Sequence, residues 1–139
     1  MAFWLVKSEP DAYSWQTFVR DGRSAWTGIR NAQARINLNT MRLGDGVLFY
    51  HSQVGKEVVG TATVVREAYP DPTSEDPRWL AVDLAPGAPL PRPVTLTDIK
   101  ADPELAEMTL IRHTRLSVSP VTDTQYRRVL QRGGSTESG

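Results

Sequence analysis

Residues 47–66, VLFYHSQVGKEVVGTATVVR, contain two apolar stretches, VLFYHS and VVGTATVVR, separated by a short polar segment with a glycine at position 55. Both stretches are rich in β-branched and aromatic residues, which fit the half-buried surface of a sheet. A short link that contains glycine favours a hairpin. The segment therefore predicts two neighbouring strands, Val47–Ser52 and Val58–Arg66.

Outside this hairpin, further short strands alternate irregularly with short helices. The other predicted strands are Ala2–Lys7, Trp79–Leu84 and a last strand at 116–120. The predicted helices are one capped by Ser14 with Trp15, Phe18 and Val19 inward, Ala32–Met41, Thr95–Lys100, Pro103–Met108 and one that begins after Thr122. Five or six strands without regular βαβ alternation predict a compact pseudo-barrel of the α+β class.

Three segments are predicted to be loops or tails. Residues 24–31, SAWTGIRN, have neither helical nor strand periodicity, yet they carry tryptophan, glycine, arginine and asparagine. Residues 85–93 are rich in proline, which lacks the N–H that a sheet ladder needs, so a central strand is not expected there. Residues 133–139, GGSTESG, are expected to be a disordered tail after a domain that spans 1–132.

The composition excludes several classes of protein. The 139 residues suffice for one domain with one core. The absence of cysteine excludes disulfides, cysteine nucleophiles and thiol redox chemistry. The two histidines lack zinc-site spacing and no phosphate loop occurs, so we expect no metal and no cofactor. No secretory signal or membrane-length apolar run is visible, so we expect a cytoplasmic protein without a membrane partner.

The charges cancel overall but are unevenly distributed. Residues 1–66 contain eight basic and five acidic residues. Residues 67–107 contain three basic and nine acidic residues, and residues 108–139 contain five basic and two acidic residues. If the two basic ends meet in space, they form a positive face. Thirteen of the sixteen basic residues are arginine, whose planar guanidinium suits phosphate.

Two pairs of neighbours are candidates for catalysis. His51 and Ser52 are adjacent in a predicted strand, so their side chains point to opposite faces and cannot act together as base and nucleophile. Lys7 and Glu9 share a face at a strand end, where they could transfer a proton. The alternative for Lys7 and Glu9 is a surface ion pair worth ~0–1 kcal/mol, and we assign no residue as catalytic.

Seven groups of residues, in one order, resemble the EVE domain family. They are WLVKSEP at 4–10, WTGIRN at 26–31, QAR at 33–35, GD at 44–45 with VLFYHS at 47–52, VVG at 58–60 with AYPDPT at 68–73, KADPELA at 100–106 and RLSVSPV at 115–121. The likeness covers about residues 3–132. Thr27 stands where the family commonly has aspartate, which bears on ligand preference more than on the fold.

The resemblance implies a PUA-like fold: a mixed β pseudo-barrel of five to six strands with short peripheral helices. It also implies a bacterial, non-catalytic module that binds modified DNA, with RNA as an alternative. Such a module would accommodate a flipped 5-methylcytosine or 5-hydroxymethylcytosine. Base flipping costs a few kcal/mol, and stacking on an aromatic side chain returns roughly 1–3 kcal/mol. Trp26 is the first choice for that platform, and a core role is its alternative.

By the same resemblance, four segments converge on one base-binding pocket. The residues carried over to it are Lys7, Ser8, Glu9, Trp26, Gly28, Ile29, Arg30, Asn31, Phe49, His51, Ser52, Leu116 and Ser117. Arginines expected to contact phosphate are Arg20, Arg23, Arg35, Arg112 and Arg115.

Two other functions stay open at this point. The pocket could belong to a small amidohydrolase that acts on modified cytidine, as in ASCH-like relatives, with Lys7 and Glu9 as its reacting groups. Alternatively, the acidic segment 67–107 could bind a protein partner and make the chain an interaction module.

Overall fold

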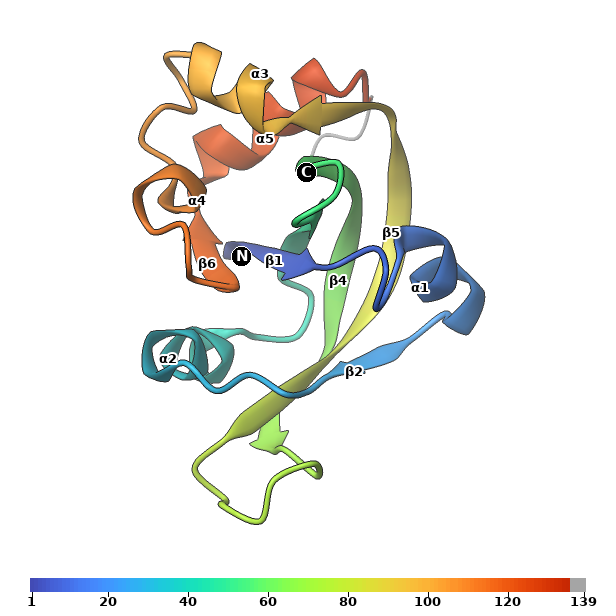
Figure 1. Ribbon diagram of the computed structural model, residues 1–139, viewed down its shortest axis with the longest axis vertical. Coiled ribbons are helices and arrows are strands. Elements are labelled where there is room, and N and C mark those ends of the chain that lie inside the picture. The colour runs from blue at the N-terminus through green and yellow to red at the C-terminus, as the bar shows by residue number, and fades with distance from the viewer. Residues whose placement is uncertain (136–139) are drawn as a thin grey trace.

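A computed structural model describes residues 1–135 and is built around one six-stranded sheet in the order β2-β5-β4-β3-β1-β6 (Figure 1). The strands are β1 (Phe3–Ser8), β2 (Ser24–Trp26), β3 (Gly46–His51), β4 (Glu57–Pro70), β5 (Leu80–Thr95) and β6 (Val118–Val121). β1 runs parallel to β3, and the other neighbouring strands are antiparallel. This mixed sheet confirms the α+β class and the β3–β4 hairpin.

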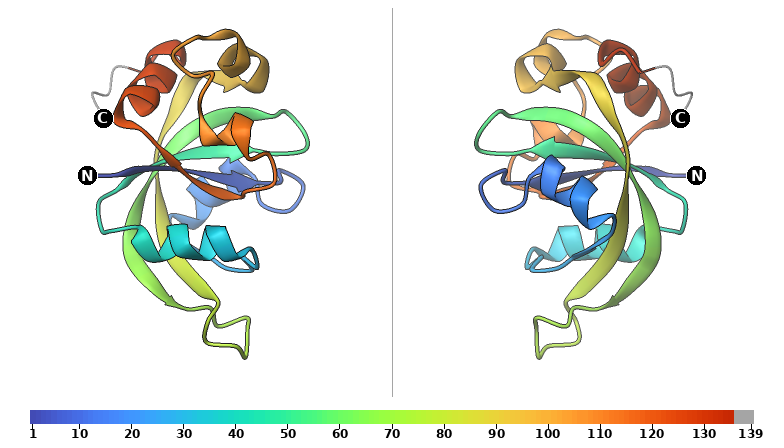
Figure 2. Two further views of the ribbon diagram at one scale, coloured as in Figure 1. Left: turned by 90° about the vertical axis from the view of Figure 1, so that its left-hand side faces the viewer. Right: turned by 90° about the vertical axis from the view of Figure 1, so that its right-hand side faces the viewer.

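Alternation of side chains gives the sheet two buried faces, because successive residues of a strand point to opposite sides. In β1, Trp4 and Val6 belong to one core cluster, and Phe3 and Leu5 belong to the other. The helices are α1 (Trp15–Asp21), α2 (Ala32–Thr40), α3 (Leu96–Ala101), α4 (Thr109–Arg112) and α5 (Asp123–Arg132). Residues of α1 and α2 join the Trp4 cluster, and residues of α3, α4 and α5 join the Phe3 cluster, so the helices lie in two groups (Figure 2).

Most helix boundaries follow the capping residues. The Ser14 side chain accepts from the backbone N–H of Thr17, and the capping boxes that begin at Thr95 and Thr122 are both complete. Gly22 ends α1 in the left-handed conformation, φ +72°, which glycine adopts without steric cost. The prediction that Val19 points inward was wrong, because this residue is 48% exposed.

Two predicted loops are strands. Residues 24–26 pair with 82–84 of β5, so a tertiary contact makes the start of the SAWTGIRN segment a short edge strand. The proline-rich residues 85–93 lie within β5, contrary to the sequence prediction. They pair only with β4, because β2 begins opposite Leu84 and does not extend past it, and the register shifts on both sides of the Gly60–Pro89 pair. The prolines therefore occupy an irregular edge, where a missing N–H donor is tolerated.

The segment between α3 and β6 also differs from the prediction. Residues 103–107 form successive turns instead of the predicted helix at 103–108, and α4 begins only at Thr109. The last strand begins at Val118, two residues later than predicted. At the start of the expected tail, the Gly133 carbonyl accepts from Arg92 N–H, and Ser135 N–H donates to the Leu130 carbonyl. Positions 136–139 lie outside the described residues.

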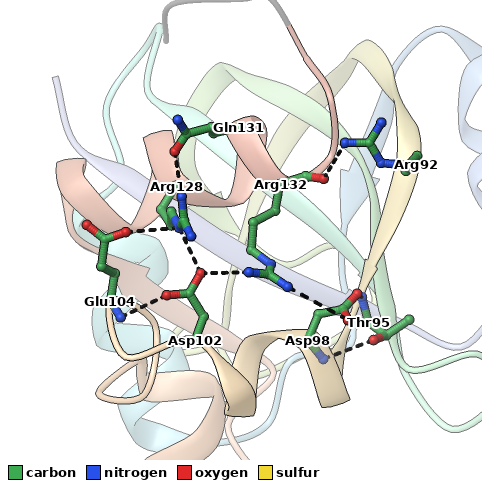
Figure 3. A network of polar contacts seen from close by, with 8 residues as sticks. All are labelled: Arg92, Thr95, Asp98, Asp102, Glu104, Arg128, Gln131 and Arg132. Carbon is green, nitrogen blue, oxygen red and sulfur yellow. Dashed lines mark hydrogen bonds and ion pairs between the residues drawn. The ribbon is translucent and has the colours of Figure 1, made fainter.

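A buried carboxylate fixes α5 to the turns after α3 (Figure 3). Asp102 is 2% exposed and accepts from Arg128 Nε at 2.7 Å and from Arg132 Nη1 at 3.1 Å. Its other oxygen accepts from the backbone N–H of Glu104 at 2.9 Å. Two arginines one helical turn apart thus hold the Asp102 carboxylate against α5. Among residues 1–135, no helix has the length and apolarity that a membrane crossing requires.

Candidate functional site

Three surface hollows meet around one hydrogen bond, from Lys7 Nζ to the Thr114 carbonyl oxygen at 2.7 Å. Lys7 lines two of the hollows, and Thr114 lines one of these and the third. Lys7 comes from the end of β1, and Thr114 from the loop between α4 and β6. The backbone N–H of Lys7 also donates to the Ser117 carbonyl, which joins β1 to that loop a second time.

The first of the three hollows, which we call the Trp26 hollow, has a volume of about 350 Å³. This volume is within the range of small-molecule binding sites. Its lining is Lys7, Ser8, Glu9, Ala12, Tyr13, Ser24, Ala25, Trp26, Thr27 and Ile29. Tyr13 meets Trp26 edge to face, with ring centroids 6.1 Å apart. Phe18 and Phe49 support Trp26 from the core at 5.9 and 5.8 Å. The indole is therefore held rigidly, with only 8% of Trp26 exposed.

The polar side of the Trp26 hollow is arranged by the turn after β1. The Ser8 hydroxyl donates to the Tyr13 carbonyl, so its oxygen can only accept from a ligand. The Glu9 carbonyl accepts from the backbone N–H groups of Ala12 and Tyr13, which fixes the turn, while the Glu9 side chain is exposed. Burial lowers the pKa of Lys7, and two of its three ammonium donors have no partner among residues 1–135.

Asp71 anchors the loop that follows Trp26. Its side chain is fully buried and accepts from Gly28 N–H at 2.8 Å and from Arg30 Nη1 at 3.0 Å. Thr73 donates to the other oxygen through both its backbone N–H and its hydroxyl, each at 2.7 Å. Burial by itself raises the pKa of Asp71, but these hydrogen bonds outweigh it and hold the pKa far below the usual range. Gly28 adopts φ +79°, which bends the loop toward Asp71.

The second, the Arg115 hollow, is the largest of the three, at about 610 Å³. Its lining is Asn31, Gln33, Asn37, Thr109, Arg112, His113, Thr114, Arg115, Leu116 and Pro120. This lining contains no carboxylate, although Arg112 is paired with the exposed Glu107 outside it. Asn31 caps α2 by accepting from Ala34 N–H, and the buried Asn37 donates to the Val118 carbonyl at 2.7 Å.

The third, the lysine hollow, has a volume of about 400 Å³ and lies between the β3–β4 turn, α3 and α4. Its lining is Lys7, Tyr50, Ser52, Gln53, Lys56, Leu96, Lys100, Leu110, Ile111 and Thr114. Lys7, Lys56 and Lys100 are all the lysines that the chain contains.

The predicted pocket residues divide among these places. Five of them line the Trp26 hollow: Lys7, Ser8, Glu9, Trp26 and Ile29. Asn31 and Leu116 line the Arg115 hollow, and Ser52 lines the lysine hollow. Gly28 and Arg30 are bound to Asp71, Ser117 offers its carbonyl to Lys7, and Phe49 has no exposure.

His51 has a role in positioning α1. Its Nε2 accepts from the backbone N–H of Trp15 at 3.1 Å, which requires that nitrogen to be unprotonated. Burial lowers the pKa of His51, and the nearby Glu57 raises it less, so the neutral imidazole is favoured. The side chain thus connects the end of β3 to the first turn of α1.

The five arginines predicted to contact phosphate do not form one surface. Arg112 and Arg115 share the Arg115 hollow. Arg23 is paired at 2.8 Å with the buried Asp83, and Arg20 lies 3.8 Å from Asp21. The Arg35 guanidinium lies over the Trp79 ring, 5.6 Å from its centroid.

Sequence reasoning missed Tyr13 and Asp71. Tyr13 follows a turn and precedes a helix cap, and nothing local indicates that its ring will face Trp26. Asp71 lies between two prolines, a pattern typical of a loop, and its partners Gly28 and Arg30 are more than 40 residues away. The described residues contain no group of three metal-ligating side chains.

Comparisons with known proteins agree with this architecture. The EVE domain family model matches residues 2–132. Thymocyte nuclear protein 1 of Mus musculus is 31% identical, over 92% of this chain and 72% of that protein. The crystal structure of Atu2648 from Agrobacterium tumefaciens is 42% identical with a TM-score of 0.96, covering 99% of this chain and 96% of that one. The structure of human THYN1 in complex with 5-methylcytosine-containing DNA is 28% identical with a TM-score of 0.90, covering 99% and 100%. The chain belongs to the EVE domain family.

Proposed function

We propose that the protein binds DNA that carries a modified cytosine and holds the modified base, turned out of the duplex, in the Trp26 hollow. The observation that carries this proposal is the hollow itself, because its lining combines the aromatic residues Tyr13 and Trp26 with the polar residues Lys7, Ser8 and Glu9. The likeness to human THYN1, whose structure contains 5-methylcytosine DNA, supports it over nearly the whole chain.

The polar groups of the Trp26 hollow match the edge of cytosine. Cytosine offers an amino donor at N4 and acceptors at N3 and O2, and a buried edge must find a partner for each. The Ser8 oxygen and the Glu9 carboxylate accept, which suits the amino group. The remaining ammonium protons of Lys7 suit the two acceptors. Stacking against one of the two rings, with the other ring at the edge of the base, would offset much of the few kcal/mol that base flipping costs.

The modification itself would contact the apolar part of the lining. A buried methyl group is worth about 0.8 kcal/mol, so we expect a preference of several fold for 5-methylcytosine over cytosine. Thr27 lines the same hollow, and its hydroxyl would be a partner for the hydroxyl of 5-hydroxymethylcytosine. 5-Hydroxymethylcytosine is therefore the alternative ligand.

The strand next to the flipped nucleotide would follow the Arg115 hollow, which adjoins the Trp26 hollow across Lys7 and Thr114. Arg112 and Arg115 supply positive charge there, and Asn31 and Gln33 supply neutral hydrogen-bonding groups. Contacts of this kind bind phosphate without reading sequence. The modified base would therefore set selectivity, and the arginines would set overall affinity.

The experiment is a titration of matched duplexes that differ at one position, cytosine, 5-methylcytosine or 5-hydroxymethylcytosine, with single-stranded and RNA versions alongside. We expect the wild-type protein to prefer a modified duplex. We expect Tyr13→Ala, which removes one aromatic wall at a half-buried position, to weaken modified-base binding by roughly tenfold, about the loss of one stacking contact.

Arg115→Gln is the matched control outside the Trp26 hollow. It should weaken binding to all duplexes by a similar factor and reduce the salt dependence, while the ratio between modified and unmodified DNA stays the same. Equal affinity of the wild-type protein for every duplex would contradict the proposal. So would a preference for modified DNA that Tyr13→Ala leaves intact and Arg115→Gln removes.

A further inference from the structure

The lysine hollow concentrates positive charge that the rest of the protein does not neutralise. At least eight of the thirteen arginines form ion pairs with carboxylates. By contrast, none of Lys7, Lys56 and Lys100 has a carboxylate oxygen within 4 Å of its ammonium nitrogen in the part of the chain that the structure describes. The three come from β1, the β3–β4 turn and α3, so the fold, and not local sequence, brings them together.

The turn that carries Gln53 and Lys56 has an unusual backbone. Gln53 and Lys56 have φ values of +67° and +49°, and they are the two non-glycine residues among 1–135 with a positive φ. Residues other than glycine rarely adopt this conformation, and here the tight turn between β3 and β4 accounts for it. Both residues line the lysine hollow. The Lys56 carbonyl accepts from Leu96 N–H at 2.9 Å, which ties the turn to the start of α3 (Figure 1).

The lining has the two parts that an anionic organic molecule needs. Leu96, Leu110 and Ile111 form an apolar side. The Ser52 hydroxyl and the Gln53 amide add hydrogen-bonding groups near the lysines, and no carboxylate lines the hollow. Glu57, which is not part of the lining, acts on the hollow by charge, since it helps to raise the pKa of Tyr50. A volume of about 400 Å³ suits a molecule of mononucleotide size.

We propose that the lysine hollow is a binding site for a small, freely diffusing phosphate ester of mononucleotide size. The phosphate would lie among Lys7, Lys56 and Lys100, and the organic part would lie against the apolar side. This site adjoins the proposed DNA site, because Lys7 lines both the lysine hollow and the Trp26 hollow. A bound phosphate ester would therefore compete with a flipped base for the Lys7 ammonium.

The test uses the full-length protein and adenosine 5′-monophosphate as the probe, with inorganic phosphate and unphosphorylated adenosine for comparison. Binding is followed by amide NMR shifts. We expect adenosine monophosphate to shift the amides of Gln53, Lys56 and Leu96, and adenosine to bind at least tenfold more weakly. The exposed double variant Lys56→Gln with Lys100→Gln should weaken binding of the monophosphate at least tenfold.

The matched control, Arg78→Gln with Arg127→Gln, removes the same charge from two exposed ion pairs elsewhere and should bind the monophosphate as the wild type does. No binding, an equal loss in both double variants, or shifts centred on Trp26 or Arg115 would overturn the proposal. The lysine double variant should keep its preference for methylated duplex. If it lost DNA binding while adenosine monophosphate did not bind at all, the lysines would serve DNA, and the phosphate-ester site would be wrong.

Discussion

At the scale of single residues, Asp71 shapes the candidate site without lining it. Its carboxylate accepts four hydrogen bonds, two of them from the loop that follows Trp26. An ionised carboxylate with no exposure is stable only because each oxygen is satisfied in this way. Gly28 and Arg30 matter through Asp71, so their place in the family motif has a structural explanation here.

Asp71→Asn should disturb that loop, because an asparagine amide presents donors to groups that are themselves donors. We expect the free energy of unfolding to fall by about 2–3 kcal/mol, the usual cost of a buried group left without its partner. Affinity for methylated duplex should fall as well. Urea denaturation and the duplex titration measure the two effects. Asp76→Asn, at a partly exposed carboxylate in the same β4–β5 loop, is the control, and equal stability of the two variants would contradict the account.

At the scale of elements, α5 is held to the sheet in two ways. Tyr126, Val129 and Leu130 bury its apolar side in the Phe3 cluster, and Arg128 and Arg132 reach Asp102 (Figure 3). The exposed pair of Arg127 with Asp123 lies on the same helix but in water. The two sets of ion pairs allow a comparison of a buried and an exposed carboxylate within one helix.

Asp102→Asn should lower the free energy of unfolding by about 2 kcal/mol, less than for a fully buried pair because both arginines are about one-third exposed. Asp123→Asn should change it by no more than about 0.5 kcal/mol. Denaturant midpoints of the two variants provide the measurement. Similar losses in both would show that burial of Asp102 contributes little.

At the scale of the whole molecule, buried carboxylates of the acidic segment form ion pairs with arginines from the two basic ends of the chain. Asp71, Asp83 and Asp102, all from the acidic segment 67–107, are buried and bind arginines from the two basic ends. The acidic segment therefore does not form a single exposed acidic face. Its most buried carboxylates contribute to the stability of the fold instead.

This pairing predicts how stability depends on pH. Burial alone raises the pKa values of Asp71, Asp83 and Asp102, but hydrogen bonds and arginines outweigh it and lower them below the ordinary value. A carboxyl group with a lowered pKa in the folded state stabilises the fold above its unfolded value, about 3.9, and loses this contribution as pH falls toward the folded value. The contribution of these three carboxylates to the free energy of unfolding should therefore be constant between pH 5 and 7 and decrease below about pH 4. Urea denaturation at several pH values tests this prediction. A free energy of unfolding that does not change between about pH 5 and pH 3 would contradict it.

Local features of the sequence were sufficient for much of the fold, and long-range contacts explain the rest. Capping residues such as Ser14 and Thr122 lie next to the helices that they begin, so α1 and α5 were predictable. The strand at 24–26 and the proline-rich half of β5 depend on which strand lies beside them, and no local pattern carries that information. In the site, five predicted residues share one hollow, whereas the contribution of Asp71 arises from partners more than 40 residues away.

The central claim, that a modified base stacks on Trp26, is tested most directly by NMR of the tryptophan indole N–H groups. The four tryptophans give four signals, and the Trp4 indole, which donates to Asp45 at 3.0 Å and is 4% exposed, is an internal reference. Addition of a duplex with one 5-methylcytosine should shift the Trp26 indole signal strongly and leave that of Trp4 in place, and the unmethylated duplex should shift Trp26 less at equal concentration. Binding of the methylated duplex with an unmoved Trp26 signal would contradict the account.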